Sequence, residues 1–345
     1  MKKRIVIPVI IIILAVAAAA VYFMIWKNKD GKNTSGAPEV IDTDMDGLVD
    51  DEDPNPDEWD VTDHDLAIFA RLAYYNGSDV TGGMYDPQNM RLDEDEPEID
   101  LRDKEQGIFE KWILENYHTE KTMGAEFCAS TFKNGKNVVV AFRGTDDSIE
   151  WVWNFVGIGL IDYHIEEAKA VEYIKEVVKK YPDCNIYITG HSLGGYLAQV
   201  SAAHMIKYLN RKPAAVVYFN GVGLDYNQKA LDSKEWAREV LKEYSNTNRL
   251  VSYQVRGDVV SLIGIHSGQQ IFIEPDREII EKASQIEDES SWSKNLGLIG
   301  TSFIEYKFGN DVADCYTKYK AKSLFAYLSI THDANNFIRI KREYQ

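Results

Sequence analysis

The stretch that decides the fold is Asn185-Ile-Tyr-Ile-Thr-Gly190-His-Ser192-Leu-Gly-Gly195, near the middle of the chain. Residues 185–189 form a short apolar run typical of a buried strand, and residues 193–209 have the pattern of a helix. Between them, residues 190–194 fit the pattern Gly-x-Ser-x-Gly. A strand, a tight turn that carries a serine and a following helix predict a reactive Ser192 beside the positive end of the helix dipole.

Strand and helix patterns alternate on both sides of this stretch. We expect a β-hairpin from residue 125 to 142 that turns at Asn134-Gly135, and a helix that begins near residue 62. Further helices are expected over 165–181 and 228–244, and further strands over 214–219 and 250–255. Alternating strands and helices predict an α/β domain over residues 60–345, with a mainly parallel sheet covered by helices on both faces.

A nucleophilic serine needs a base, and the base needs an acid that orients it. Asp258 follows the strand predicted over 250–255, where such an acid is expected, and His332 lies 74 residues further on. Asp225 is the alternative acid and His266 the alternative base. Of the other nearby histidines, His191 precedes the serine and is expected to point elsewhere, and His204 lies three turns along the helix of the serine.

An acyl-transfer site also needs two donors for the developing oxyanion. The N–H of Leu193, directly after the serine, is one candidate. The other is Thr145, which follows the strand predicted over 137–142 and can donate both its N–H and its hydroxyl.

These motifs resemble the class 3 lipases, the fungal-type branch of the α/β-hydrolases. Phe142-Arg-Gly-Thr145 is similar to the oxyanion strand of that family, residues 190–195 to its nucleophile turn, and Arg256-Gly-Asp-Val-Val260 to its acid motif. The resemblance is strong over residues 125–275. It implies ester hydrolysis by a Ser192–His332–Asp258 triad through an acyl-enzyme, with no cofactor in catalysis and a lipid or other ester as substrate.

Other segments resemble the family less closely. Thr331-His-Asp333 is a weaker match to the segment of the catalytic histidine, and His266-Ser-Gly268 resembles a motif whose histidine is not catalytic. Ser261 stands where fungal members tend to have proline. Residues 149–161, with two tryptophans and a phenylalanine, occupy the place of the family's lid, although ordinary core packing explains their composition equally well.

An acidic loop over residues 42–57 precedes the α/β domain. Its carboxylates fall at positions 1, 3, 5, 9 and 12, with glycine at position 6, which is the spacing of calcium-binding loops. A solvated acidic linker is the alternative. Pro54 and Pro56, which come just after the last predicted ligand, break any flanking helix, so the segment resembles a thrombospondin type 3 repeat. The predicted ligands of a structural Ca²⁺ are Asp42, Asp44, Asp46, the Leu48 carbonyl, Asp50 and Asp53.

The first 26 residues predict a membrane segment. An uncharged apolar run over residues 5–26 follows Lys2, Lys3 and Arg4, and 22 helical residues span about 33 Å, close to the thickness of a bilayer core. We expect a single N-terminal transmembrane helix, a tether over residues 27–41 and an extracellular catalytic domain at the cell membrane. If the segment is a cleaved signal peptide instead, the domain is secreted.

The net charge of −17 argues against nucleic acid as a partner, because phosphate would be repelled. Thirteen of the acidic residues lie between Glu39 and Asp65, so the charge belongs mainly to the acidic loop and its flanks. Three widely spaced cysteines exclude a disulfide scaffold.

Taken together, the motifs of the sequence predict a membrane-tethered serine ester hydrolase. Its alternatives are a catalytically inactive, calcium-stabilised binding module and a serine peptidase or amidase on the same fold.

Overall fold

The computed structural model describes most of the α/β domain and the acidic loop. The described residues are 41–46, 48–78, 82–84, 106–122, 125–145, 164–225, 234–283, 310–319, 327 and 330–338. Within them no helix is both long and apolar enough to cross a membrane. The predicted membrane segment over residues 5–26 and most of the tether lie outside the described residues, as does the predicted lid over residues 149–161.

Eight strands form one sheet in which the spatial order equals the chain order. The first three pairings, from β1 to β4, are antiparallel, and the four pairings from β4 to β8 are parallel. The strands are β1 (Gly83–Met84), β2 (Ile113–Thr122), β3 (Ala125–Asn134), β4 (Asn137–Phe142), β5 (Asn185–His191), β6 (Ala215–Phe219), β7 (Arg249–Val255) and β8 (Gln269–Ile273).

The predicted parallel sheet is therefore the β4–β8 half of a mixed sheet. The predicted hairpin is β3 and β4, joined through Asn134 and Asn137, and the strands predicted over 214–219 and 250–255 are β6 and β7. Neither β2 nor β8 was expected. The sequence of β2, ILENYHTEKT, mixes charged and apolar side chains, so it lacks the apolar run by which buried parallel strands are found.

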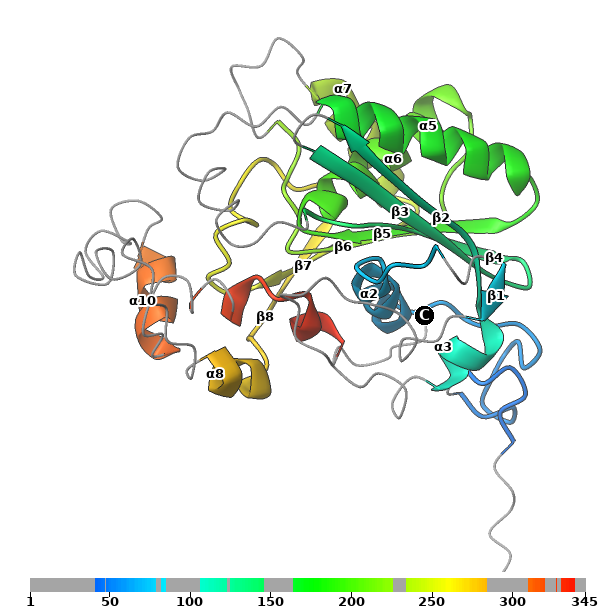
Figure 1. Ribbon diagram of the computed structural model, residues 1–345, viewed down its shortest axis with the longest axis horizontal. Coiled ribbons are helices and arrows are strands. Elements are labelled where there is room, and N and C mark those ends of the chain that lie inside the picture. The colour runs from blue at the N-terminus through cyan, green and yellow to red at the C-terminus, as the bar shows by residue number, and fades with distance from the viewer. Residues whose placement is uncertain are drawn as a thin grey trace, which may run out of the picture.

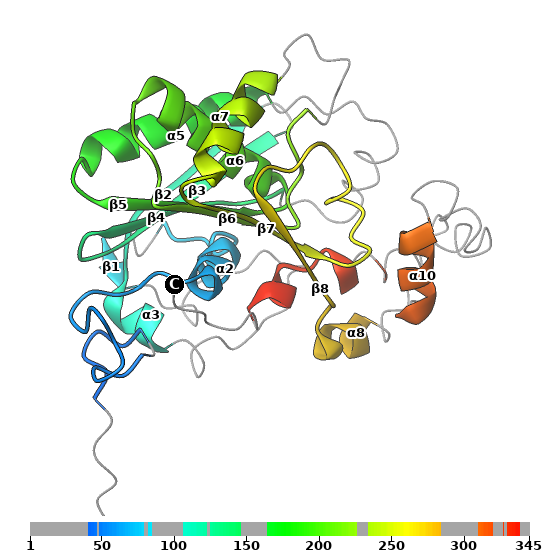
Figure 2. The same cartoon turned by 180° about the vertical axis from the view of Figure 1, so that it is seen from behind.

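Helices cover both faces of the sheet, as predicted (Figure 1). One face carries α5 (His164–Lys180), α6 (Leu193–Tyr208) and α7 (Glu235–Ser245); the other carries α2 (Asp63–Leu72) and α3 (Gln106–Lys111) (Figure 2). Two apolar clusters fill the space between the sheet and these two layers. The remaining elements are α8 (Arg277–Ala283), α10 (Asn310–Lys318) and the 3₁₀ helix η2 (Ala334–Phe337).

The helix α2 is fixed at its start and along its length. Thr62 and Asp65 form a reciprocal capping box, which satisfies two N–H groups of the first turn. Asp63 pairs with Arg249 of β7 at 2.9 Å, and Thr189 of β5 donates its hydroxyl to the Leu66 carbonyl at 3.1 Å. These contacts hold α2 under the centre of the sheet, so the residues that follow it reach the C-terminal ends of the parallel strands.

The described part of α7 begins at Glu235, whereas a start near residue 228 was predicted; residues 226–233 lie outside the described part. The helix predicted over 165–181 is confirmed as α5. All three cysteines, Cys128, Cys184 and Cys315, are free.

Candidate active site

The turn between β5 and α6 places Ser192 in a strained conformation. Its φ is 59° and its ψ is −127°, a combination that side-chain-bearing residues rarely adopt. The neighbouring glycines permit the turn, since a Cβ on Gly194 would lie 2.1 Å from the Phe142 carbonyl oxygen, and one on Gly190 would lie 2.3 Å from the Gly194 carbonyl oxygen. Only glycines at these positions allow the turn to pack this closely against the end of β4.

Three side chains far apart in sequence meet at this turn. His332 Nε2 lies 2.8 Å from Ser192 Oγ, and His332 Nδ1 lies 2.9 Å from Asp258 Oδ1. A carboxylate only accepts, so Nδ1 carries the hydrogen and Nε2 is free to accept the serine proton. The structure thus brings together the three residues that the sequence singled out as nucleophile, base and acid.

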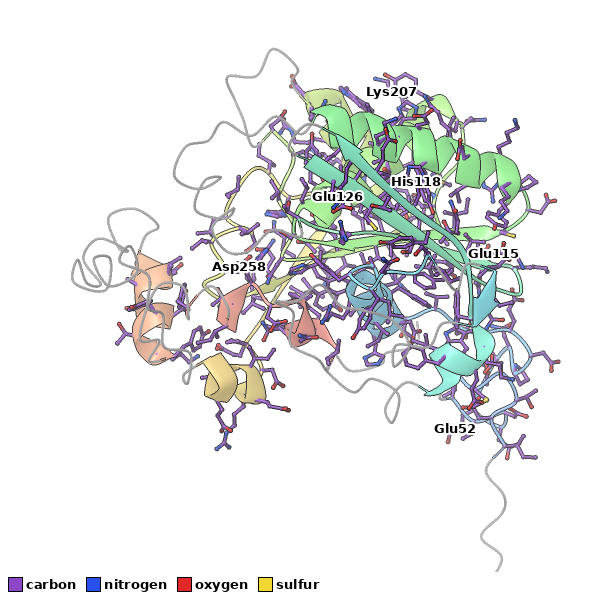
Figure 3. All side chains as sticks on the ribbon, in the orientation of Figure 1. Glu52, Glu115, His118, Glu126, Lys207 and Asp258 are labelled. Atoms are coloured by element: carbon purple, nitrogen blue, oxygen red, sulfur yellow. The ribbon has the colours of Figure 1, made fainter. Side chains whose placement is uncertain are left out.

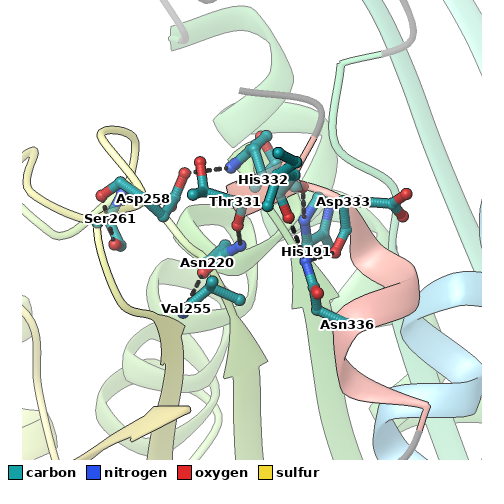
Figure 4. Close-up of polar contacts among 12 residues, drawn as sticks. His191, Asn220, Val255, Asp258, Ser261, Thr331, His332, Asp333 and Asn336 are labelled. Carbon is teal, nitrogen blue, oxygen red and sulfur yellow. Dashed lines mark hydrogen bonds and ion pairs between the residues drawn. The ribbon is translucent and has the colours of Figure 1, made fainter. Parts of the chain in front are cut away.

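Asp258 is fully buried and both of its oxygens are occupied. Oδ1 faces His332, and Oδ2 accepts the N–H of Ser261 at 2.9 Å (Figure 4). Gly257 enters this turn with a φ of 85°, and a Cβ there would lie 2.2 Å from the Tyr327 hydroxyl. Ser261, the position at which the sequence departs from the fungal pattern, therefore supplies a donor that proline lacks.

The segment that carries His332 is fixed to the ends of two strands. Asn220, just after β6, donates its side-chain amide to the Thr331 carbonyl at 2.8 Å and accepts the N–H of Val255, the last residue of β7, at 2.8 Å. Asn336 donates to the carbonyls of Ile330 and Asp333. Figure 4 shows these contacts converging around the imidazole. No short sequence pattern indicates the two hydrogen bonds of Asn220, because its partners lie 35 and 111 positions away.

The alternative site residues are engaged elsewhere. His266 Nε2 lies 2.6 Å from the Ser261 carbonyl oxygen, its ring stacks on Tyr218, and burial lowers its pKa. Asp225 accepts the Lys234 N–H and pairs with Arg238 at 2.6 Å. His204 packs on the ring of Tyr208 within α6.

His191 corrects one expectation. It was expected to point away from the site, yet its ring lies 4.8 Å from the ring of His332 and its Nε2 lies 2.9 Å from the His332 carbonyl oxygen. The expectation rested on the place of His191 directly before the serine, which does not show where the His332 segment, 141 positions away, packs.

The loop after β4 lies against the serine. A Cβ on Gly144 would be 2.8 Å from the Ser192 Cβ, so the next residue, Thr145, is delivered to the site. The Thr145 Oγ1 is buried and has no hydrogen-bond partner among the described residues. Leu193 stands in the first turn of α6, whose N–H groups have no carbonyl partner within the helix. Of the two predicted oxyanion donors, Leu193 thus directly follows the serine, and Thr145 follows the glycine that packs against it.

The acidic loop gathers three of its six predicted ligands. One oxygen each from Asp42, Asp44 and Asp46 lies within 4.8 Å of the others. Asp44 is 7% exposed and its Oδ2 has no hydrogen-bond partner among the described residues; the same holds for Oδ2 of Asp53, 8% exposed. Burial and the neighbouring aspartates raise the pKa of Asp44 to about 7. Buried, mutually repelling carboxylates are the donor set of a Ca²⁺ site.

One predicted ligand, Asp50, is hydrogen-bonded within the loop. It accepts hydrogen bonds from the N–H and the hydroxyl of Thr43, at 2.8 and 2.7 Å, and so closes the loop. The Leu48 N–H donates to Asp46 at 2.8 Å, while the predicted ligand at this position is the Leu48 carbonyl oxygen. In Figure 3, Glu52 of this loop and Asp258 lie on opposite sides of the molecule, so any ion bound here would be remote from the serine.

Comparisons with known proteins gave several similar solved structures and one matching family. The chain is similar to the Lip2 lipase of Yarrowia lipolytica, with 17% identity over 61% of this chain and 77% of that one and a TM-score of 0.41. It is also similar to a lipase of Rhizopus microsporus var. chinensis, with 16% identity over 62% and 74% and a TM-score of 0.41. No curated protein matches. The Mbeg1-like family model matches residues 109–282, half of the chain and the part that holds Ser192 and Asp258, and the chain therefore belongs to the Mbeg1-like family.

Proposed function

We propose that this protein is a serine ester hydrolase that cleaves carboxylic esters, with lipid acyl esters as the preferred class. One observation carries the proposal: the continuous hydrogen-bonded row from Ser192 Oγ through His332 to Asp258, at 2.8 and 2.9 Å. Such a row removes the proton of a serine as its oxygen attacks and stabilises the imidazolium that results.

The first half of the reaction forms an acyl-enzyme. Ser192 Oγ bonds to the ester carbonyl carbon while its proton passes to His332 Nε2. The carbonyl oxygen becomes an oxyanion, for which the N–H of Leu193 and the N–H and hydroxyl of Thr145 are the proposed donors. The tetrahedral adduct then expels the alcohol, which takes the proton from His332 Nε2.

The second half restores the enzyme. Water attacks the acyl carbon and gives one proton to His332 Nε2, and the new adduct expels Ser192 Oγ, which recovers that proton. The product is the carboxylic acid. Asp258 keeps its charge throughout and holds the Nδ1–H of His332.

The test is labelling of the full chain, in detergent micelles, by a fluorophosphonate probe, together with turnover of p-nitrophenyl esters. We expect labelling and turnover that both disappear in Ser192→Ala. Absence of labelling in folded wild-type protein would favour the inactive binding module. Faster turnover of peptide amides than of esters would favour a peptidase or amidase.

Two further proposals concern the location of the protein and the ion that stabilises it. We propose that residues 5–26 anchor the chain at the cell membrane with the domain outside, and that a secreted form results if that segment is cleaved. We also propose that Ca²⁺ binds the acidic loop through its predicted ligands: Asp42, Asp44, Asp46, the Leu48 carbonyl, Asp50 and Asp53. The ion would neutralise buried carboxylates and so stabilise the loop, with no part in the chemistry at Ser192.

A further inference from the structure

His191 stands between two hydrogen-bond partners that fix its protonation. Its Nε2 lies 2.9 Å from the main-chain carbonyl oxygen of His332, and its Nδ1 lies 2.8 Å from the Tyr74 hydroxyl. A carbonyl oxygen only accepts, so Nε2 carries the hydrogen and Nδ1 accepts from the Tyr74 hydroxyl. A single neutral tautomer therefore satisfies both ring nitrogens at once.

The surroundings keep that ring neutral. Burial, repulsion by a protonated His332 and the nearby Arg71 hold the pKa of His191 well below its ordinary value, outweighing the hydrogen bond to the His332 carbonyl. The two imidazoles lie 4.8 Å apart. When His332 takes the serine proton, its neighbour adds no second positive charge, and Asp258 remains its counter-ion.

Tyr74 is placed by elements that have no part in the triad. It follows α2, and the buried guanidinium of Arg71 lies 5.9 Å from the centre of its ring. Arg71 Nε also donates to Asn335 of η2, at 2.8 Å, just beyond His332. A Cβ on Gly144 would lie 2.5 Å from the Tyr74 hydroxyl, so the glycine of the oxyanion loop leaves the space that this hydroxyl occupies.

We propose that Tyr74 and His191 are positioning residues that hold the main chain of His332 where its Nε2 faces Ser192. The inference deepens the proposed function and rests on it. Both side chains are buried, each only 4% exposed. They act through the His332 carbonyl oxygen, which is two bonds from the Cα that carries the imidazole. A displacement of the base by about 1 Å can cost about 100-fold in rate.

The kinetic test compares three variants, with kcat expressed per serine titrated by the fluorophosphonate. His191→Phe keeps a ring but loses both hydrogen bonds, and we expect kcat to fall about 100-fold with KM nearly unchanged. Tyr74→Phe removes one hydroxyl, for an expected fall of about tenfold. His191→Gln should recover most of kcat, because an amide donates through nitrogen and accepts through oxygen.

Tyr75→Phe is the matched control, since Tyr75 is buried under the same guanidinium, 5.3 Å from its ring centre. Its kcat should stay within twofold of the wild type. Kinetics of both His191→Phe and Tyr74→Phe that equal those of the wild type would overturn the proposal. If His191→Phe does not fold, Tyr74→Phe and its kcat decide.

A second measurement does not depend on activity. ¹⁵N spectra of histidine-labelled Ser192→Ala protein at pH 7 should show His191 as the neutral Nε2–H tautomer. An Nδ1–H tautomer or a charged ring would refute the positioning arrangement even if esters are cleaved. Absence of ester turnover and of labelling in the wild type, with the expected spectrum, would instead refute the proposed function alone.

Discussion

Two buried aspartates at opposite sides of the molecule differ in how they are satisfied. Asp258 accepts hydrogen bonds on both oxygens, from His332 and from Ser261. Asp44 accepts the Asp46 N–H on one oxygen, and its other oxygen has no hydrogen-bond partner in the described part of the chain. An unsatisfied buried carboxylate is costly. The chain thus satisfies both oxygens of Asp258 with its own atoms, whereas one oxygen of Asp44 is the place where the proposed Ca²⁺ would bind.

The largest effect should come from removing the charge of Asp258. In Asp258→Asn, the amide carries no charge, so the imidazole loses its counter-ion. The amide NH₂ group cannot accept a hydrogen bond, so either the Nδ1–H of His332 or the N–H of Ser261 loses its acceptor. We expect kcat for ester hydrolysis to fall by about 10³- to 10⁴-fold. Asp225→Asn, which alters the alternative acid, should lose little. The opposite ranking in steady-state kinetics would reassign the acid.

Ca²⁺ binding to the acidic loop should raise the stability of the folded protein. At a free Ca²⁺ concentration about 100 times the dissociation constant, the native state gains about 2.7 kcal/mol, which raises the melting temperature by about 5 °C. Asp44→Asn should weaken this gain, and Asp57→Asn, an exposed acid of the same segment, should not. Identical melting curves in chelator and in excess Ca²⁺ would count against the site.

Glu166, at the start of α5, carries another buried carboxyl group. Burial raises its pKa to about 7, against a partial opposing effect of Arg143. The folded state therefore holds this proton more tightly than the unfolded state, so the stabilisation is complete below about pH 4.5 and is lost as pH rises through 7. The loss amounts to about 3 kcal/mol.

Glu166→Gln should therefore be more stable than the wild type at pH 8 and equally stable at pH 4. Urea unfolding at the two pH values measures the difference. Glu172→Gln, an exposed change on the same helix, should shift neither curve. A stability difference that does not vary with pH would show that Glu166 ionises as an ordinary carboxylate.

The smallest effect concerns the second hydrogen bond of Asp258. Ser261→Pro removes the N–H that donates to Oδ2, leaving a buried oxygen unsatisfied as in Asp44. We expect kcat to fall about tenfold. Ser261→Ala keeps that N–H and loses only the hydroxyl contact to the Asp258 carbonyl, so a loss of about twofold is expected. Equal losses in the two variants would assign the effect to the hydroxyl.

Local chemistry explains what could be predicted from the sequence. The turn at Ser192 needs glycines at fixed positions, and a buried parallel strand needs an apolar run, so both are visible within a dozen residues. The strand β2 was missed because its side chains are mixed in polarity. The roles of Tyr74, His191 and Asn220 were missed because their partners lie 35 to 141 positions away, and no short pattern encodes such pairings.

The acidic loop shows the same limit on a smaller scale. The carboxylate of Asp50, one of the predicted ligands, accepts two hydrogen bonds from Thr43 and so closes the loop. The spacing of the carboxylates predicts which residues lie near one another, but these hydrogen bonds depend on a backbone geometry that the spacing does not record.

The agreement between spatial and chain order in the sheet has a consequence for how the protein is made. Each strand can pair with the strand synthesised just before it, so the scaffold can assemble progressively, beginning with its N-terminal part. His332 follows Asp258 by 74 positions and Ser192 by 140. In the growing chain, Ser192 is therefore synthesised well before His332, its hydrogen-bond partner, and the two side chains can meet only after the sheet around them has been built.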